Sequence, residues 1–353
     1  MSACVSYPIS LPRVSVLIPC RNEQDHIGGC LESLLQNDYP HELLEVLVID
    51  GMSEDDTRNI VAEYTARHRF VTLLDNRARI APSALNAGLR VATGEIVMRM
   101  DAHVTYPPHY IGRLVRALEE SGVDGVGCAV DTRPSGPGAV ARAIALALSH
   151  PFGVGNSYFR IGASQRRLVD TVPFGCYRRE IFARYGPFDE DLVRGQDEEF
   201  NFRVGRRGGR IMLVPEVVAV YFARRTLRQV ARMYYQYGYF KPWVAHKVGR
   251  VMTVRQLVPA TLLTALALSG VGALILAPLL TCFVLLLTLY AGGIIACTAG
   301  VARAQGIRCA LALTVVFPLL HFSYGAGFVI GAARLLRRSG VALGNPAAVP
   351  LSR

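Results

Sequence analysis

The sequence VSVLIPCRNE, residues 14–23, decides the fold of this chain. Its first half, Val14–Ile18, is a short apolar run bounded by prolines, which is typical of a buried parallel β-strand. Its second half places an arginine, an asparagine and a glutamate where that strand ends. Open α/β sheets bind their ligands at the carboxyl ends of the strands, so we expect a functional site at this edge.

Further apolar runs alternate with helical patterns along the first hundred residues. Strands are predicted at 44–49, 71–74 and 95–100, and helices over 23–36, from Ser53 onward and over 82–92. This alternation predicts an α/β domain with a doubly wound, mostly parallel sheet. Two later strands are expected at 211–214 and 217–222, so that residues 1–222 form the catalytic domain.

The C-terminal third has the composition of a membrane protein. Residues 257–301 contain no charged side chain, and a span needs about 20 apolar residues. We therefore expect two helices that turn near Pro278 and a third over 309–333, which makes 257–338 a transmembrane region of about three helices. Three spans conflict with the positive-inside rule, because they place Arg334, Arg337 and Arg338 on the far side. Either the third segment is re-entrant or one count is wrong, and we keep three spans as the expectation. Residues 339–353 are predicted to be a tail.

Residues 223–256 are basic and aromatic, as expected of amphipathic helices at a membrane interface. The formal net charge is +11, and residues 203–255 hold twelve Lys or Arg against one acid, Glu216. Because this belt adjoins the first apolar segment, it favours lipid headgroups or a lipid-linked pyrophosphate over nucleic acid. No nucleic-acid-binding motif supports the other reading.

The cysteines and the N-terminus both indicate a cytoplasmic catalytic domain. The eight cysteines form no CxxC pair, which favours reduced thiols over zinc sites or disulfides. Residues 1–13 lack a basic region followed by an apolar core, so we expect no cleaved signal peptide.

Four more short motifs place chemistry at predicted element ends: DGMS at 50–53, NAG at 86–88, DAH at 101–103 and QDEE at 196–199. Asp50 follows a strand directly and could accept a hydrogen bond from a base or ribose, or could simply cap a helix. Asp101 and His103 stand two residues apart at a strand end, where both can turn toward one divalent cation. Mn²⁺ accepts such mixed ligands, and Mg²⁺ prefers oxygen.

The remaining candidates are acidic, basic or small residues. The acidic cluster 196–199 could hold a general base, or could be a solvated helix N-terminus favoured by the helix dipole. Gly175 and Cys176 could let backbone approach a sugar closely, or could form only a turn. Several arginines could contact the base or phosphates of a nucleotide, although each alone is more often a surface residue: Arg21, Arg79, Arg225 and Arg232.

Taken together in this order, the motifs resemble those of family 2 glycosyltransferases with the GT-A fold, over roughly residues 13–245. Within that family, the chain is similar to the ExoA-like group of succinoglycan biosynthesis glycosyltransferases. The resemblance implies a UDP-sugar donor, a divalent metal ion (Mn²⁺ or Mg²⁺), inversion at the anomeric carbon and a polyprenyl-linked saccharide acceptor in exopolysaccharide assembly. It also implies a protein of the bacterial inner membrane whose catalytic domain is cytoplasmic.

The same resemblance implies roles for individual residues. Asp197 is implied as the catalytic base, with Glu198 beside the acceptor, and Asp101 and His103 at the metal and the diphosphate. Asp50 is implied at the uracil end of the donor site, which also takes in the first motif through Pro19, Arg21 and Glu23.

Two departures from the family pattern bear on the activity. His103 stands where the superfamily usually has the second aspartate of Asp-x-Asp, although polypeptide GalNAc transferases also use Asp-x-His. Processive synthases carry Gln-x-x-Arg-Trp after the base motif, whereas residues 229–233 read QVARM. We therefore expect transfer of one hexose, with glucose as the first candidate. The alternatives are a processive synthase, a transferase to a polyprenyl monophosphate, a nucleotidyltransferase or a non-catalytic membrane scaffold.

Overall fold

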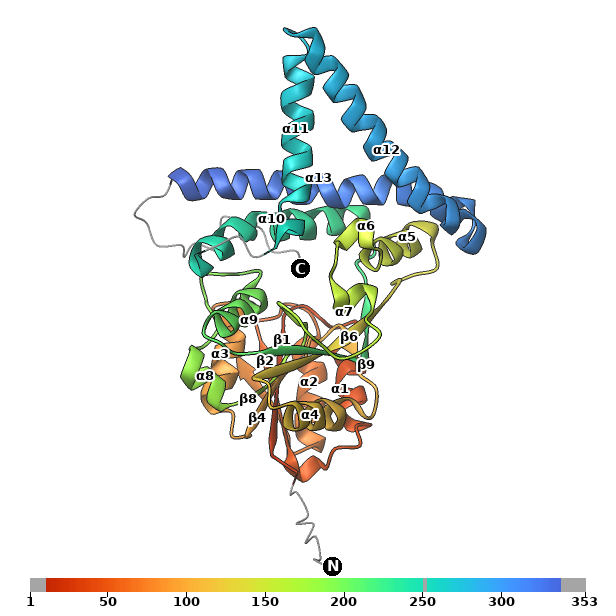
Figure 1. Ribbon diagram of the computed structural model, residues 1–353. Helices are drawn as coiled ribbons and strands as arrows, with labels where there is room; N and C mark the ends of the chain where they lie inside the picture. Colours follow the sequence, from red (N-terminus) through yellow and green to blue (C-terminus); the bar gives the residue numbers. More distant parts are fainter. Residues whose placement is uncertain (1–10, 250–252, 338–353) are drawn as a thin grey trace, which may run out of the picture.

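The computed structural model describes residues 11–249 and 253–337, and the predicted tail at 339–353 lies outside them. Figure 1 shows two parts stacked on one another. A unit built around a sheet comes from the first two thirds of the chain. Helices from the last third form a layer beside it, and two of them project outward.

The strands of the described chain form one sheet with the order β3-β2-β1-β4-β8-β6-β9-β5, and β7 pairs with β9. They are β1 (Val14–Cys20), β2 (Leu44–Asp50), β3 (Val71–Asp75), β4 (Ile96–Arg99), β5 (Val104–Thr105), β6 (Gly125–Arg133), β7 (Arg167–Leu168), β8 (Cys176–Arg178) and β9 (Ile211–Phe222). β1 to β4 pair in parallel, as do β6 and β9, and β8 is antiparallel between β4 and β6. The predicted mixed, mostly parallel sheet is confirmed. The two strands expected at 211–214 and 217–222 are one strand, β9.

Helices cover both faces of this sheet, and the described chain after β9 is mainly helical. They are α1 (Ile27–Leu35), α2 (Thr57–Arg67), α3 (Ala81–Val91), α4 (Tyr110–Ser121), α5 (Ala139–Leu148), α6 (Pro151–Val154), α7 (Tyr158–Ile161), α8 (Glu180–Tyr185), α9 (Gln196–Arg206), α10 (Leu227–Val248), α11 (Val258–Gly272), α12 (Ala277–Gln305) and α13 (Ile307–Arg337). Two short 3₁₀ turns, η1 (His41–Leu43) and η2 (Val254–Gln256), complete the set. The helix predicted from Ser53 begins only at Thr57, because the Ser53 hydroxyl is bound to Asp50 and Asn22.

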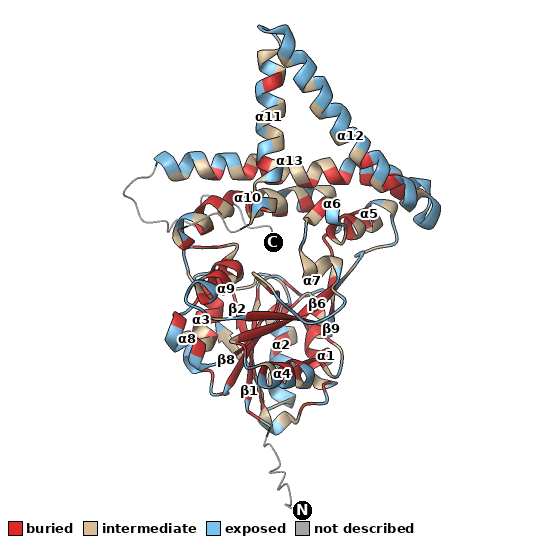
Figure 2. Ribbon diagram, in the orientation of Figure 1, coloured by how far each residue is buried: buried red, intermediate tan, exposed pale blue. Residues whose placement is uncertain are grey.

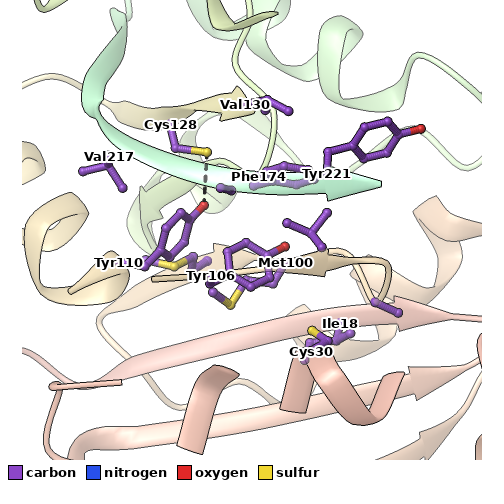
Figure 3. Packing of buried hydrophobic residues seen from close by; sticks show 14 of the residues in the cluster. Ile18, Cys30, Met100, Tyr106, Tyr110, Cys128, Val130, Phe174, Val217 and Tyr221 are labelled. Carbon is purple, nitrogen blue, oxygen red and sulfur yellow. Dashed lines mark hydrogen bonds between the residues drawn. The ribbon is translucent and has the colours of Figure 1, made fainter. Parts of the chain in front are cut away.

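The core lies on both faces of the sheet, whose strands are almost entirely buried (Figure 2). On one face Tyr106, Tyr110 and Phe174 pack edge to face, and the Tyr110 hydroxyl lies 3.6 Å from Cys128 Sγ (Figure 3). On the other face α3 approaches so closely that a Cβ on Gly88 would lie 2.8 Å from Leu17. The NAG motif is therefore used at least partly for packing.

The last three helices carry the apolar C-terminal third. α12 and α13 are long and apolar enough to cross a membrane by length and composition, whereas α11 has only 15 residues. The turn between α11 and α12 falls just before Pro278, as the sequence predicts. The third helix, predicted over 309–333, is α13, which runs through Pro318 without a break. The domain limits 1–222, 223–256 and 257–338 remain predictions.

Candidate active site

A cavity of about 590 Å³ lies between the sheet and the C-terminal helices. One part of its wall is polar and comes from the ends of β4 and α9 and from the basic residues nearby. The other part is apolar and comes from α6, α11, α12 and α13. Its polar lining includes Asp101, His103, Asp197, Glu198 and Arg224, and its apolar lining includes Phe152, Leu262, Tyr290, Leu320 and Tyr324.

Arg99, the last residue of β4, joins the two carboxylates nearest the centre of the polar wall. Its Nη2 and Nε each lie 2.9 Å from Asp101 Oδ1, and its Nη1 forms an ion pair with Asp197. β4 sits in the middle of the sheet beside β1, so its carboxyl end points toward the first turn of α9. The structure thus brings together two motifs that are 96 residues apart in sequence, DAH and QDEE.

Asp197 is placed in the first turn of α9, and about a third of its side chain, 31%, is exposed. Burial raises the pKa of its carboxyl group above the ordinary value, and the nearby Arg99 opposes this rise. The two effects act in opposite directions on a carboxyl group in a partly dry site. A carboxylate in this state can accept a proton from a substrate hydroxyl.

His103 lies on the same wall, two residues beyond Asp101. Its Nδ1 is 3.4 Å from Glu23 Oε1, and its ring meets the edge of Tyr221 at 5.5 Å between centroids. Glu23 thereby links the first motif, at the end of β1, to the cavity. Among the described residues, no cluster of three or more His, Cys, Asp or Glu side chains is arranged to hold a metal ion. Asp101 and His103 both line the cavity, and together they offer an oxygen and a nitrogen donor, a mixed pair that Mn²⁺ accepts.

Asp50 is fully buried at the end of β2, outside the residues that line the cavity. Its Oδ2 accepts hydrogen bonds from Arg58 Nη1 at 2.7 Å and from the Ser53 amide at 3.0 Å. Arg58 also reaches Asp75 Oδ1 at 2.9 Å, across the ends of two neighbouring strands. The carboxylate is thus held rigidly by its own loop and by α2.

Arg21 and Arg79 meet the same acid from two different loops. Arg21 Nη2 is 3.6 Å from Glu54 Oε1, and Arg79 Nη1 is 3.7 Å from that atom. Arg79 has a backbone φ of 61°, in the left-handed region that non-glycine residues rarely adopt. These two arginines and Glu54 form a second polar group, and the half-buried Pro19 lies near the end of β1.

Glu198 is fixed by the C-terminal part of the chain. Lys241 of α10 forms an ion pair with it, and the Gln256 side-chain amide donates a hydrogen bond to its other oxygen. The three side chains line the cavity, and the Glu198 and Lys241 side chains are only 12% and 16% exposed. The acidic motif on α9 is therefore tied to α10 and to the turn that precedes α11.

Besides Pro19, Arg21, Glu23, Asp50 and Arg79, four more of the predicted site residues lie away from the cavity lining. Cys176 is fully buried in β8 within the sheet core, and burial raises the pKa of its thiol, so the side chain cannot reach an acceptor in the cavity. A Cβ on Gly175 would lie 2.2 Å from the Tyr177 ring, so this glycine serves packing inside the sheet. Arg225 and Arg232 are exposed and do not line the cavity. Their neighbour Arg224 does line it, and its Nε has no hydrogen-bond partner among residues 11–249 and 253–337.

The sequence reasoning missed Arg99, Arg58, Lys241 and Gln256. Arg99 had a usable signal, because it is the last residue of a predicted strand and stands two positions before Asp101. Lys241 had none, because its pairing with Glu198 joins segments 43 residues apart. Basic residues of the interface segment were expected to face lipid or phosphate, not an acid of the catalytic domain.

Comparisons with known proteins agree with this architecture. The family model described as Glycosyl transferase family 2 matches residues 15–186. The succinoglycan biosynthesis protein ExoA of Rhizobium meliloti is 32% identical over 225 residues, which cover 63% of this chain and 67% of that protein. The dolichyl N-acetyl-alpha-D-glucosaminyl phosphate 3-beta-D-2,3-diacetamido-2,3-dideoxy-beta-D-glucuronosyltransferase of Methanococcus voltae is 28% identical over 243 residues, which cover 66% of this chain and 74% of that protein.

Among solved structures, the mannosyltransferase PcManGT from Pyrobaculum calidifontis, in complex with GDP-Man and Mn²⁺, is similar with a TM-score of 0.60 at 23% identity. The match covers 94% of this chain and 89% of that one, so the likeness in fold includes the C-terminal helices. The fold, the motifs and the relatives define a glycosyltransferase. The chain belongs to glycosyl transferase family 2.

Proposed function

We propose that this chain transfers one hexose, with inversion, from a UDP-sugar to a polyprenyl-pyrophosphate-linked saccharide during exopolysaccharide assembly. The observation that carries the proposal is the divided cavity, with acids and arginines on one wall and apolar side chains of α11 to α13 on the other. An acceptor with a sugar, a pyrophosphate and a long hydrocarbon chain matches both walls. The relatives named above, which act in succinoglycan biosynthesis and on a dolichyl phosphate sugar, support this class of acceptor.

In the proposed reaction Asp197 accepts the proton of the acceptor hydroxyl. The acceptor oxygen then forms a bond to the anomeric carbon on the face opposite the leaving group, while the bond from that carbon to the UDP oxygen breaks. Arg224, whose Nε has no partner in the described structure, faces the cavity where the diphosphate leaves with its negative charge. Asp50, Arg21 and Arg79 form the nucleotide end of the donor site.

Asp101 and His103 would hold Mn²⁺ or Mg²⁺. When bound, such an ion neutralises charge on the diphosphate. Arg99 keeps the Asp101 carboxylate oriented toward this position and holds Asp197 on the acceptor side.

We further propose that the protein works at the bacterial inner membrane with its catalytic domain in the cytoplasm. Two helices are long and apolar enough to cross a membrane, and the basic segment before them suits anionic headgroups. Sugar nucleotides are made in the cytoplasm, where the sheet and its donor site must therefore lie.

The proposal is tested by measuring nucleotide release from purified protein in detergent. The donors are a panel of UDP-sugars and GDP-mannose, with Mn²⁺ or Mg²⁺, in the presence and absence of a polyprenyl-pyrophosphate saccharide. UDP release that rises with the lipid acceptor, with one sugar added per lipid, is the expected result. A polymeric product would indicate a processive synthase, and absence of both nucleotide binding and release would indicate a non-catalytic scaffold.

The change Asp197→Asn should lower turnover by about two orders of magnitude or more, because the amide cannot accept the proton. Binding of UDP should persist, since Asp197 lies on the acceptor side of the site. Glu63→Gln makes the same chemical change at a surface acid that is 67% exposed and should leave turnover unchanged. Turnover close to normal in Asp197→Asn would remove this residue from the role of base.

A further inference from the structure

The outermost apolar helices of the chain are arranged differently from a set of three membrane spans. α13 does not stand beside α11 and α12; it lies flat along α10, and the other two rise away from it (Figure 1). This arrangement raises the question of how deeply each helix enters a bilayer.

α13 packs along most of its length against helices that lie next to the sheet, among them α10 and α6. A Cβ on Gly327 would lie 2.1 Å from the Tyr235 carbonyl of α10, and one on Gly331 would lie 2.2 Å from the Tyr239 carbonyl. Nearer its N-terminus, His321 Nε2 lies 2.8 Å from the Phe152 carbonyl of α6. Because α10 carries arginines and lysines, a helix fixed alongside it cannot run through the hydrocarbon interior.

The two projecting helices, α11 and α12, extend beyond α13 for only a short distance. α11 crosses α13 where Pro259 and Leu263 approach Gly325, so its part beyond α13, up to Gly272, rises about 14 Å at 1.5 Å per residue. α12 returns to α13 at Tyr290, whose hydroxyl lies 2.8 Å from His321 Nδ1. Its free part is then about 20 Å long by the same rise per residue. Both lengths are shorter than the hydrocarbon core of a bilayer, about 30 Å.

The turn that joins α11 to α12 has the chemistry of a segment buried in lipid. Leu274 and Ile275 are its most exposed side chains, at 86% and 82%, and no charged residue occurs between Arg255 and Arg303. Four successive amides of the turn are bonded within the hairpin. Ala273 N donates to Ser269 O, Leu274 N to Val271 O, and both Ile275 N and Leu276 N to Gly272 O, at 2.8 to 3.2 Å. A turn in water needs no such closure, whereas a turn in hydrocarbon does.

We propose that α11 and α12 form a re-entrant hairpin that enters the leaflet facing the catalytic domain and returns without crossing the bilayer. α13 lies in the interface of that leaflet. The proposal rests on the membrane association proposed above. It adds how deeply the hairpin enters the bilayer and from which side. It places Arg303, Arg308, Arg334 and Arg337 on the catalytic side, which removes the conflict that three spans create with the positive-inside rule.

The test uses the full-length protein reconstituted in sealed vesicles with the catalytic domain outside. In a background where the native Cys4, Cys282 and Cys297 are replaced by alanine, single cysteines are introduced as Leu274→Cys at the tip, Leu336→Cys at the end of α13 and Glu63→Cys on the catalytic domain. Each is treated with a membrane-impermeant maleimide added outside or trapped inside. Acceptor-dependent UDP release confirms that each variant is folded.

We expect outside labelling at positions 336 and 63, and labelling at 274 from neither side until detergent is added. A fluorophore at position 274 should be quenched more strongly by a nitroxide in the middle of the lipid chain than by one at the headgroup. Inside labelling at 274 would show that the hairpin spans, and inside labelling at 336 would show that α13 spans; either result overturns the proposal. Failure of the protein to float with vesicles would instead overturn the membrane association itself.

Discussion

Arg99 holds together the two carboxylates on which the proposed chemistry depends. It lies between Asp101 and Asp197, and its side chain is only 12% exposed. Without it, two carboxylates would share one partly dry wall of the cavity. The ionisation of Asp197 is therefore set by its burial, which raises the pKa, and by this guanidinium, which lowers it.

The change Arg99→Met should move the acid limb of the pH profile of kcat/KM to higher pH by about one to three units. Loss of the positive charge raises the pKa of Asp197 further, and a protonated carboxyl cannot act as a base. Arg99→Lys retains the charge and should move the limb less. Arg166→Met, at a surface arginine paired with Glu216, is the matched control. An acid limb that stays in place in Arg99→Met would show that Asp197 does not limit the rate in this range.

Glu198 could stabilise the fold or could bind the acceptor, and one substitution distinguishes these two roles. The change Glu198→Gln leaves the Lys241 ammonium largely buried without its partner, and loss of one member of a buried pair costs about 3–5 kcal/mol. The free energy of unfolding in detergent should fall accordingly, and a second change, Lys241→Met, should restore part of it. Unchanged stability with lost acceptor-dependent turnover would instead assign Glu198 to the acceptor.

At the level of the elements, α10 and α13 touch backbone to backbone through glycines. The change Gly327→Ala places a methyl group against the Tyr235 carbonyl, and overpacking of this kind costs about 1–3 kcal/mol. Gly300→Ala is the control on α12, where nothing lies within 4 Å. We expect Gly327→Ala to lower the Tm in detergent and Gly300→Ala to leave it unchanged or raise it. Equal Tm values would show that α10 and α13 can move apart without a loss of stability.

The strands of the first hundred residues could be predicted because each depends on a local apolar run. β1, β2, β3 and β4 begin and end within two residues of the predicted limits. The start of α2 could not be predicted, because Ser53 is held by Asp50, three residues before it, and by Asn22, which is its neighbour only in the folded chain. Local capping rules would have placed it in the helix.

The candidate site could be predicted in part for the same reason. Asp101, His103 and Asp197 stand in motifs at element ends, and the structure gathers them in one cavity. The partner of Glu198 could not be found, because a lysine in a basic segment carries no sign of an acid 43 residues away. The length of an apolar helix predicts that it prefers lipid, but not whether it crosses the bilayer. The orientation of α13 comes only from its packing on α10, which the sequence does not reveal.

At the level of the whole molecule, the cavity is formed jointly by the sheet-containing part of the chain and by the C-terminal helices. Leu262 of α11 belongs to its apolar wall, whereas Leu268 of the same helix is 68% exposed and faces away from it. The change Leu262→Trp should raise the KM for the lipid acceptor at least about tenfold, which corresponds to about 1.4 kcal/mol. Binding of the donor nucleotide should not change.

Leu268→Trp adds the same bulk to the same helix outside the cavity, so it should leave the KM near that of the unaltered protein. Steady-state UDP release at varied acceptor concentration measures both. If Leu262→Trp and Leu268→Trp behave alike, the apolar wall does not contact the acceptor.

The contact of Glu198 with Lys241 and Gln256 also has a consequence for how the chain folds during its synthesis. A ribosome completes every strand of the sheet before it makes either partner, because β9 ends at Phe222. At that point the chain contains every strand of the sheet, but Glu198 in the first turn of α9 does not yet have either partner. Glu198 therefore gains its partners only when the segment that leads directly into α11 and α12 has been made, so the order of synthesis couples completion of the cavity to the start of the apolar helices.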